Sequence, residues 1–329
     1  MGVPTMHRML SVAAFVFLAG SMIGAPQDSQ DDFQSYGSRA KRHSEGAGAP
    51  EIVPHRKHAR TAAAPTAGST GYMTPDIQNV NNGPVMNTPN VYLIWYGNWK
   101  KTSGSDTASG QQIIRDFLHG LSGSNYYLTN RSYPGVSGTF SVMGEYTDNY
   151  SQTSKLSDSR VQAVVSHAIS VKALLKDSNG IYFVLTSSDV AESSGFCRQY
   201  CGWHTAGTIS GTDIKYAFVG NASRCISACA AQTVGPNGNA GVDGMISVIA
   251  HELEETNTDP DLNAWFDGKG AEDADKCAWT FGANQKRASN GAYYNMSLPR
   301  ADGTMRNYLV QRELDVNSKC YVDYVTGAQ

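Results

Sequence analysis

Continuous apolar runs along the chain predict buried β-strands. Residues 91–96 (VYLIWY), 180–186 (GIYFVLT) and 214–219 (IKYAFV) consist mainly of residues that favour β-structure. Apolar runs without alternation, such as the first two, are typical of strands that are buried on both faces of a sheet. Residues 138–146 alternate between polar and apolar positions, which indicates a further strand.

Helical spacing of apolar residues predicts three helices. Residues 111–121 and 157–175 carry apolar side chains at intervals of three and four positions. Residues 245–255 form another apolar segment, and Asp243 stands where a helix N-cap is expected. Strands alternating with helices predict an α/β (α+β) fold, in which a layered mixed β-sheet has flanking helices.

The N-terminus has the form of a secretory signal peptide. Residues 1–8 are basic, and residues 9–24 (MLSVAAFVFLAGSMIG) form a short apolar region. This region is short for a membrane span and is interrupted by small residues. We therefore expect residues 1–25 to be a signal peptide, and we expect a secreted product with no membrane span.

A polar segment follows the predicted signal peptide. Residues 26–74 contain few large apolar side chains, so burial cannot offset the entropy of ordering them. We expect this segment to be disordered. The dibasic stretch at 39–42 (RAKR) is consistent either with a removable pro-region or with a solvated linker. The folded domain is then expected to span residues 75–329.

The charge of the predicted domain argues against nucleic-acid binding. Residues 71–329 contain 19 Lys and Arg against 24 Asp and Glu, a net charge of −5, and no basic stripe is present. We expect partners of another kind: a cell-wall component, a peptide or an extracellular protein. The sequence makes no prediction of oligomeric state.

The cysteines predict a disulfide-stapled, loop-rich C-terminal half. An even number after a signal peptide favours three disulfides, with the pairing left open. Two Cys-x3-Cys pairs also allow a four-thiolate zinc site. The Gly-rich segment between 197 and 229 is expected to be an excursion from the sheet. The six residues are Cys197, Cys201, Cys225, Cys229, Cys277 and Cys320.

Asn-x-Ser/Thr sequons mark candidate glycosylation sites. A secreted chain exposes such sequons to the glycosylation machinery, and used sites lie on surface loops. The motif also arises by chance, so we expect only some sites to be used. The four candidates are Asn130, Asn149, Asn221 and Asn295.

Several long motifs in order give the chain a family resemblance. They are NVYLIWYGNW (90–99), GIYFVLTSSDV (180–190), FCRQYCGWH (196–204), IKYAFVGNA (214–222), DGMISVIAHELEETNTDPDLNAWFD (243–267) and EDADKC (272–277). On these stretches the chain resembles the EXORDIUM-like, or phosphate-induced-protein, family of secreted plant and microbial proteins. The resemblance covers about residues 85–325. It implies location in the apoplast or cell wall and a link to growth responses, and it implies little about biochemistry.

The helix motif departs from the usual family form. The family form is His-Glu-Leu-Ala-Glu followed by Thr-Asn-Pro. Here the corresponding stretches are His-Glu-Leu-Glu-Glu and Thr-Asp-Pro, which are closer to the microbial branch.

The helix motif also predicts a metal site in a zincin-like core. Residues four apart share a helix face, so His251 and Glu255 point the same way. Zinc proteases use His-Glu-x-x-His, in which the histidines bind zinc and the glutamate activates water. With Glu255 in place of the second histidine, His251 and Glu255 are candidate zinc ligands, and Glu252 is the candidate catalytic base.

A third ligand is needed from elsewhere in the chain. Asp275 follows Glu255 by twenty residues, a separation like that in thermolysin-type enzymes. Asp275 and Glu272 are therefore the preferred candidates. The alternatives are Asp259, Asp267 and, from the cysteine-rich segment, His204.

Other interpretations of the motif stay open. A carboxylate in place of a histidine makes the site harder, which weakens the preference for zinc over calcium or manganese. The acidic residues could also form a hydrogen-bonded structural cluster or a solvated helix end. Trp95, Tyr96 and Trp99 could stack on sugars, although core packing is the simpler interpretation.

Two functional hypotheses follow. The first is a zinc-dependent hydrolase, most simply a peptidase, with calcium as the alternative metal. The second is a non-catalytic extracellular protein that binds a cell-wall component or takes part in growth signalling. Metal content and the effect of changing Glu252 distinguish them.

Overall fold

The computed structural model describes residue 2 and residues 53–54, 77–79 and 81–329. The predicted signal peptide lies outside these residues apart from Gly2. The predicted pro-region or linker lies outside them apart from the two-residue strand β1 (Val53–Pro54).

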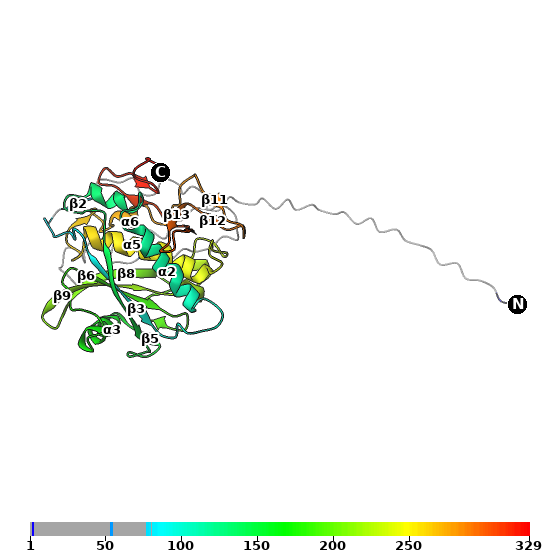
Figure 1. Ribbon diagram of the computed structural model, residues 1–329, viewed down its shortest axis with the longest axis horizontal. Coiled ribbons are helices and arrows are strands. Elements are labelled where there is room, and N and C mark those ends of the chain that lie inside the picture. Colours follow the sequence, from blue (N-terminus) through cyan, green and yellow to red (C-terminus); the bar gives the residue numbers. More distant parts are fainter. Residues whose placement is uncertain (1, 3–52, 55–76, 80) are drawn as a thin grey trace.

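A mixed β-sheet forms the centre of the fold (Figure 1). Its five main strands have the order β8-β9-β6-β3-β4, and β1 pairs with the outer edge of β8. The parallel strands are β3, β4, β6 and β9, whereas β8 runs antiparallel to β9. The bounds are β3 (Asn90–Tyr96), β4 (Ser141–Asp148), β6 (Gly180–Thr186), β8 (Tyr200–Ile209) and β9 (Thr212–Val219).

The apolar runs form the interior strands of the sheet, as predicted. Every residue of β6 is buried, and every residue of β3 after Asn90 is buried as well. The two strands pair in register, so Tyr92 lies beside Tyr182 with ring centroids 4.7 Å apart. These strands are buried because helices cover both faces of the sheet.

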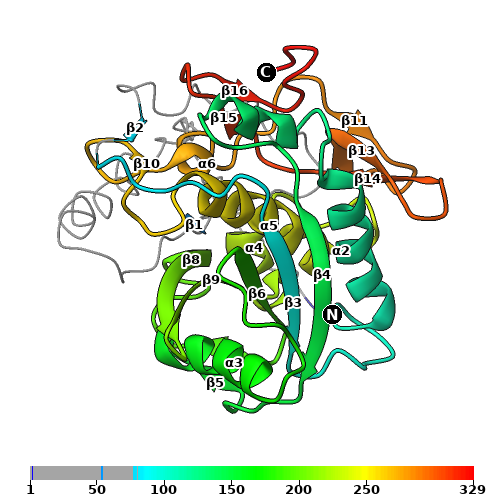
Figure 2. The same ribbon diagram turned by 60° about the vertical axis from the view of Figure 1, so that its left-hand side comes forward.

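Three helices build the outer layers. Helices α2 (Ala108–Leu121) and α5 (Ala240–Thr258) lie over one face, and α3 (Asp158–Ser170) lies under the other (Figure 2). The side chain of Asn239 caps α5 by accepting the Val242 N–H at 3.2 Å. The predicted N-cap at Asp243 is therefore wrong, because the helix begins one turn earlier.

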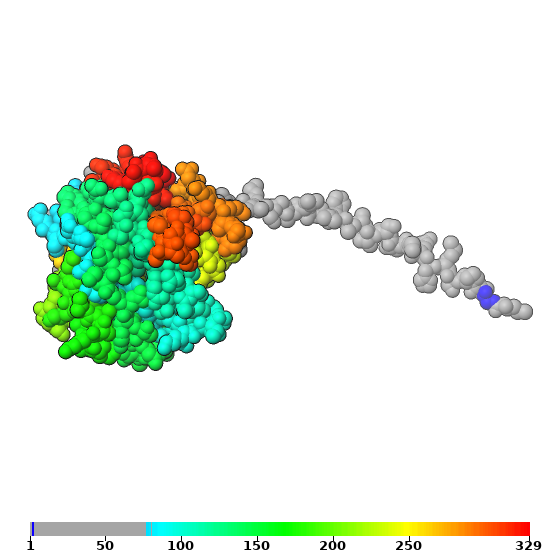
Figure 3. Space-filling view, in the orientation of Figure 1, coloured from blue at the N-terminus to red at the C-terminus, as the bar shows by residue number. Residues whose placement is uncertain are grey.

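Short elements complete the fold, and the C-terminal ones lie over α2 and α5 at the end of the molecule opposite α3 (Figures 1 and 3). Their bounds are β2 (Gln78–Asn79), η2 (Tyr127–Ser132), β5 (Lys155–Leu156), β7 (Ala191–Glu192), η3 (Ala222–Arg224), α4 (Ile226–Cys229), β10 (Trp265–Phe266), α6 (Asp273–Lys276), β11 (Lys286–Arg287), β12 (Tyr293–Tyr294), β13 (Met296–Pro299), β14 (Met305–Tyr308), β15 (Glu313–Leu314) and β16 (Cys320–Tyr321).

All six cysteines form disulfides, so the four-thiolate zinc site is wrong. The expected excursion at 197–229 is also wrong, since β8 and β9 are strands of the main sheet. Two disulfides join the start of β8 to the region of α4, and the third fixes the end of α6. The pairs are Cys197–Cys225, Cys201–Cys229 and Cys277–Cys320.

Within the described residues, no helix has both the length and the apolar character needed to cross a bilayer.

Candidate metal centre

Helix α5 carries ionisable side chains into the interior. Every residue of the helix after Ala240 is buried. His251, Glu252, Glu254 and Glu255 are each 0% exposed, so the solvated helix end is excluded. A buried carboxylate is unfavourable unless it is hydrogen-bonded, paired or bound to a cation. Each buried carboxylate of α5 should therefore have a hydrogen-bond, ionic or metal partner nearby.

His251, Glu255 and Asp275 converge on one side of α5. The Nε2 atom of His251 lies 2.8 Å from Glu255 Oε1 and 3.7 Å from Asp275 Oδ1. Ligands of a tetrahedral zinc ion lie roughly 3.3 Å apart when each bond is about 2.0–2.1 Å long. The three side chains are therefore placed as a cation would require, and together they form a group that could hold one.

His204 brings a second group together from strand β8. Its Nδ1 atom lies 3.4 Å from Glu252 Oε2 and 3.6 Å from Glu255 Oε2. His204, Glu252 and Glu255 also could hold a metal ion by their spacing. Glu255 thus belongs to both groups, with one oxygen facing each histidine.

Hydrogen bonds orient both imidazole rings. His204 Nε2 lies 3.4 Å from the Asp259 carbonyl oxygen, so an Nε2–H can donate to it and leave Nδ1 as an acceptor. The amide of Gln311 contacts His251 Nδ1. If Gln311 presents its oxygen, His251 donates from Nδ1 and keeps the Nε2 lone pair for a cation.

A glycine lets β8 approach α5 closely. A Cβ atom on Gly202 would lie 2.5 Å from Val248 Cγ1, 2.8 Å from the Phe218 carbonyl oxygen and 2.9 Å from Glu252 Oε1. Gly202 is two residues from His204, so both face the same side of the strand. The missing side chain at 202 is what allows His204 to reach the helix carboxylates.

Burial and mutual contact shift the pKa values in the cluster. Burial disfavours the charged form of His204, but the nearby carboxylates of Glu252 and Glu255 outweigh it and raise its pKa to about 10. Burial raises the pKa of Glu252 to about 7. The pKa of Glu255 is lowered because the charges of the two histidines outweigh its burial. Without a cation, protons on the histidines compensate the carboxylates.

The remaining candidate ligands have other roles. Glu272 faces His204, with Oε1 3.9 Å from Nε2, so it does not join the His251 group. Asp259 Oδ1 accepts the backbone N–H groups of the turn that follows α5 at 2.6 Å. Asp267 pairs with Lys276 at 2.7 Å. Of the third ligands considered, Asp275 is the one beside His251.

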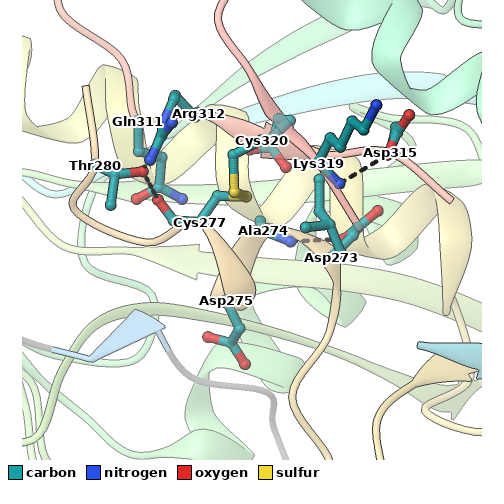
Figure 4. The surroundings of a disulfide bond; sticks show 12 residues. Asp273, Ala274, Asp275, Cys277, Thr280, Gln311, Arg312, Asp315, Lys319 and Cys320 are labelled. Carbon is teal, nitrogen blue, oxygen red and sulfur yellow. Dashed lines mark hydrogen bonds between the residues drawn. A yellow bond between two sulfur atoms is a disulfide. The ribbon is translucent and has the colours of Figure 1, made fainter. Parts of the chain in front are cut away.

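The disulfide Cys277–Cys320 fixes the segment that carries Asp275 (Figure 4). Asp275 lies on α6, and its side chain points away from the disulfide (Figure 4). The Asp275 N–H donates to Glu255 Oε1 at 3.1 Å, which ties α6 to α5 directly. The cross-link and this hydrogen bond together set the position of the third carboxylate.

The aromatic cluster at the end of β3 is core and not a sugar platform. Trp95, Tyr96 and Trp99 are 1%, 0% and 2% exposed. The Trp99 indole N–H donates to the Leu185 carbonyl at 3.1 Å, and the Trp95 indole donates to Glu145 at 2.9 Å. Their faces are therefore unavailable for stacking on a ligand.

The sequons differ sharply in exposure. Asn130 and Asn221 are 0% exposed, and Asn221 donates to Asp106 at 2.7 Å. Asn295 is half-buried and bonds the backbone of Val310 through both amide atoms. Asn149 is exposed. A glycan needs a solvent-facing amide, so Asn149 is the candidate that the folded chain accommodates.

Sequence reasoning gave His204 only as an alternative and missed Gln311. The pattern Gly202-x-His204 on a strand was the available signal, because a glycine two residues from a histidine marks a close approach. Gln311 lies 60 positions from His251 and has no local signal in the chain.

Comparison with known proteins places the chain in a family. Residues 79–320 match the phosphate-induced protein 1 conserved region. The chain is 32% identical over 279 residues to protein EXORDIUM-like 3 of Arabidopsis thaliana, covering 70% of this chain and 77% of that protein. It is 32% identical over 263 residues to protein EXORDIUM-like 5 of Arabidopsis thaliana, covering 68% of this chain and 69% of that protein.

The chain also resembles a tobacco protein, whereas it matches no solved structure. The chain is 28% identical over 251 residues to protein PHOSPHATE-INDUCED 1 of Nicotiana tabacum, covering 66% of this chain and 75% of that protein. No solved structure matches the chain, so the likeness to zinc proteases rests on the helix motif alone. The chain belongs to the phosphate-induced protein 1, or EXORDIUM-like, family.

Proposed function

We propose that this protein is a secreted metallohydrolase whose buried centre binds a divalent cation through His251, Glu255 and Asp275. The observation that carries the proposal is the convergence of these three side chains from α5 and α6, with His251 Nε2 2.8 Å and 3.7 Å from the two carboxylates. Secretion is supported by the three disulfides, which persist in oxidising compartments. The proposed location is the apoplast or cell wall.

Zinc fits this donor set best. An imidazole nitrogen favours zinc over calcium, which prefers a shell of oxygen ligands. Two carboxylates make the site harder than one built from histidines, so manganese and calcium are the competing ions. The contact between the Gln311 amide and His251 Nδ1 holds the ring so that Nε2 faces Glu255 and Asp275.

Glu252 is the proposed general base. A divalent cation supplies a Lewis acid that polarises a carbonyl and acidifies water. Glu252 follows His251 in the chain, and neither of its carboxylate oxygens has a hydrogen-bond partner in the structure. Such a carboxylate can take the proton of an attacking water and return it to a leaving amine. The proposed substrate class is therefore a peptide bond.

A specific observation favours a second candidate function. His251 and Glu255 side chains are 0% exposed, and that of Asp275 is 1% exposed. A cation so deeply buried could serve only to hold α5 against α6. The protein would then be a non-catalytic extracellular binding or signalling protein, with a cell-wall component, peptide or protein as partner.

Metal analysis of the purified protein tests the cation. We expect at least one zinc per chain, and His251→Ala should lower the content while His119→Ala, at an exposed histidine on α2, leaves it unchanged. A metal-free protein after secretion in zinc-containing medium would end the proposal.

A peptide library tests catalysis separately. Glu252→Gln should lower hydrolysis by roughly 100-fold or more while the His251 group keeps its zinc. Zinc binding without hydrolysis of any peptide would favour the non-catalytic function. Hydrolysis unchanged in Glu252→Gln would remove the role of this residue.

A further inference from the structure

We propose that Glu255 bridges two cation sites, one formed with His251 and Asp275 and the other with His204 and Glu252. This inference rests on the proposed cation at His251 and adds a second ion on the opposite side of the same carboxylate. Two-metal sites of hydrolytic enzymes place their ions about 3.5–4 Å apart, a separation that one carboxylate can span.

The two halves have matching geometry. Glu255 Oε1 lies 2.8 Å from His251 Nε2, and Glu255 Oε2 lies 3.6 Å from His204 Nδ1. Each half adds one further carboxylate oxygen, at 3.7 Å for Asp275 and 3.4 Å for Glu252. These distances lie on either side of the roughly 3.3 Å expected between ligand atoms on one zinc ion.

Unsatisfied polar atoms mark the second half as a binding site. His204 Nδ1, both carboxylate oxygens of Glu252 and Glu255 Oε2 have no hydrogen-bond partner, although all three residues are 0% exposed. Leaving a buried carboxylate without donors costs roughly 1–3 kcal/mol or more. A cation between these atoms would satisfy all of them at once.

The short His204–Glu252 and His251–Glu255 contacts fail the geometry of a hydrogen bond, although they are close enough for one. In each pair the histidine nitrogen has no hydrogen-bond partner, although the carboxylate oxygen lies within 3.4 Å. Ligands of a common ion have this relationship, because each atom directs its lone pair at the ion and not at its neighbour.

Charge balance favours two ions over one. Four carboxylates lie against the two histidines: Glu252, Glu255, Glu272 and Asp275. Two divalent cations neutralise four carboxylates while both imidazoles stay neutral and able to ligate. One cation leaves two negative charges in the interior, and protonating a histidine to balance them would remove it as a ligand.

The second ion changes the role of Glu252. In the singly loaded protein its carboxylate is available as a base, whereas in the doubly loaded protein it is a ligand. A second equivalent of cation should therefore lower peptide hydrolysis, which makes the His204 half an inhibitory site for the same metal.

Metal stoichiometry of the full chain tests the inference. The protein is stripped with a chelator and titrated with zinc by calorimetry, with metal content measured after desalting. Two equivalents are expected. One equivalent would overturn the second site and leave the proposed function intact, and none would overturn both.

Variants assign the two sites. His204→Ala and His251→Ala should each reduce binding from two equivalents to one, while His119→Ala keeps both. Two equivalents retained in His204→Ala would overturn the assignment.

A variant of a buried histidine can fail to fold. The wild-type chain loaded with two Mn²⁺ therefore provides a test of the shared carboxylate that needs no variant. Electron paramagnetic resonance should show an exchange-coupled pair. The spectrum of two isolated ions would contradict a shared carboxylate.

Discussion

The Nε2 atom of His251 lies 2.8 Å from Glu255 Oε1, one turn further along α5, and neither side chain is exposed. A helix supplies this pairing automatically, since residues four apart share a face. Such a pair in the interior needs a reason, because burial opposes charge on both groups. The proposed cation provides that reason and leads to measurable consequences.

Removing the cation should destabilise the folded protein. A ligand bound only by the native state at about 100 times its dissociation constant adds about 2.7 kcal/mol to the free energy of unfolding. Chelation should then lower the thermal midpoint by roughly 5–10 °C. Scanning calorimetry with and without EDTA measures this. The midpoint of the double variant His204→Ala/His251→Ala, which lacks the histidine of each proposed site, should respond much less to EDTA, and an equal response would show that the chelator acts elsewhere.

Adding a single methyl group at Gly202 should disturb the centre. The Cβ atom would lie 2.8 Å from the Phe218 carbonyl oxygen, a backbone atom that cannot move aside easily. We expect Gly202→Ala to cost about 1–3 kcal/mol in urea unfolding and to weaken zinc binding. Gly268 has open space around its Cβ position, so Gly268→Ala is the control and should be neutral. Equal stability of the two variants would contradict the close approach of β8 to α5.

Breaking the disulfide Cys277–Cys320 should affect the metal as well as stability. The cross-link closes a separation of 43 residues beside α6, and its loss should cost about 2–5 kcal/mol. The double Cys→Ser variant should also bind zinc more weakly, because Asp275 loses its anchor. The matching variant at Cys197 and Cys225 should lose stability with a smaller effect on zinc affinity. Denaturant titration and calorimetry separate the two effects.

Stability should depend on pH through Asp243. Burial raises the pKa of this carboxyl from 3.8 to about 6. The folded state therefore keeps the proton to higher pH than the unfolded chain does, and stability is lost as the pH rises from about 4 to about 6. Relative to wild type, Asp243→Asn should gain up to about 3 kcal/mol across this range. If the free energy of unfolding of wild type and of Asp243→Asn changed equally with pH, Asp243 would not titrate in this way.

Glycan occupancy should follow exposure. Asn149 is exposed, whereas Asn130 and Asn221 are 0% exposed. Mass spectrometry of the secreted protein should find a glycan at Asn149 and none at the two buried sites. Asn149→Gln should remove it without loss of stability. A glycan at Asn130 or Asn221 in the folded protein would contradict the packing around them.

Local pattern was enough to predict much of the scaffold. The apolar runs at 91–96 and 180–186 lie within interior strands, since a strand buried on both faces carries no polar alternation. The pattern also placed the central part of α5, although its start at Ala240 was missed because Gly241 and Gly244 weaken the helical signal of the first turns. The even number of cysteines indicated disulfides but did not indicate how the cysteines pair.

The sequence alone determined that His251, Glu252 and Glu255 share a helix with apolar neighbours, because these are local properties, and the structure decided that this helix end is buried. Only the tertiary structure decided that Asp275 rather than Glu272 meets His251, and that His204 meets Glu252 and Glu255. Those contacts join α5 to β8 and α6. They depend on how a glycine-lined strand packs against the helix and on a disulfide that holds the following segment. Long-range packing of this kind leaves no periodic trace in the chain.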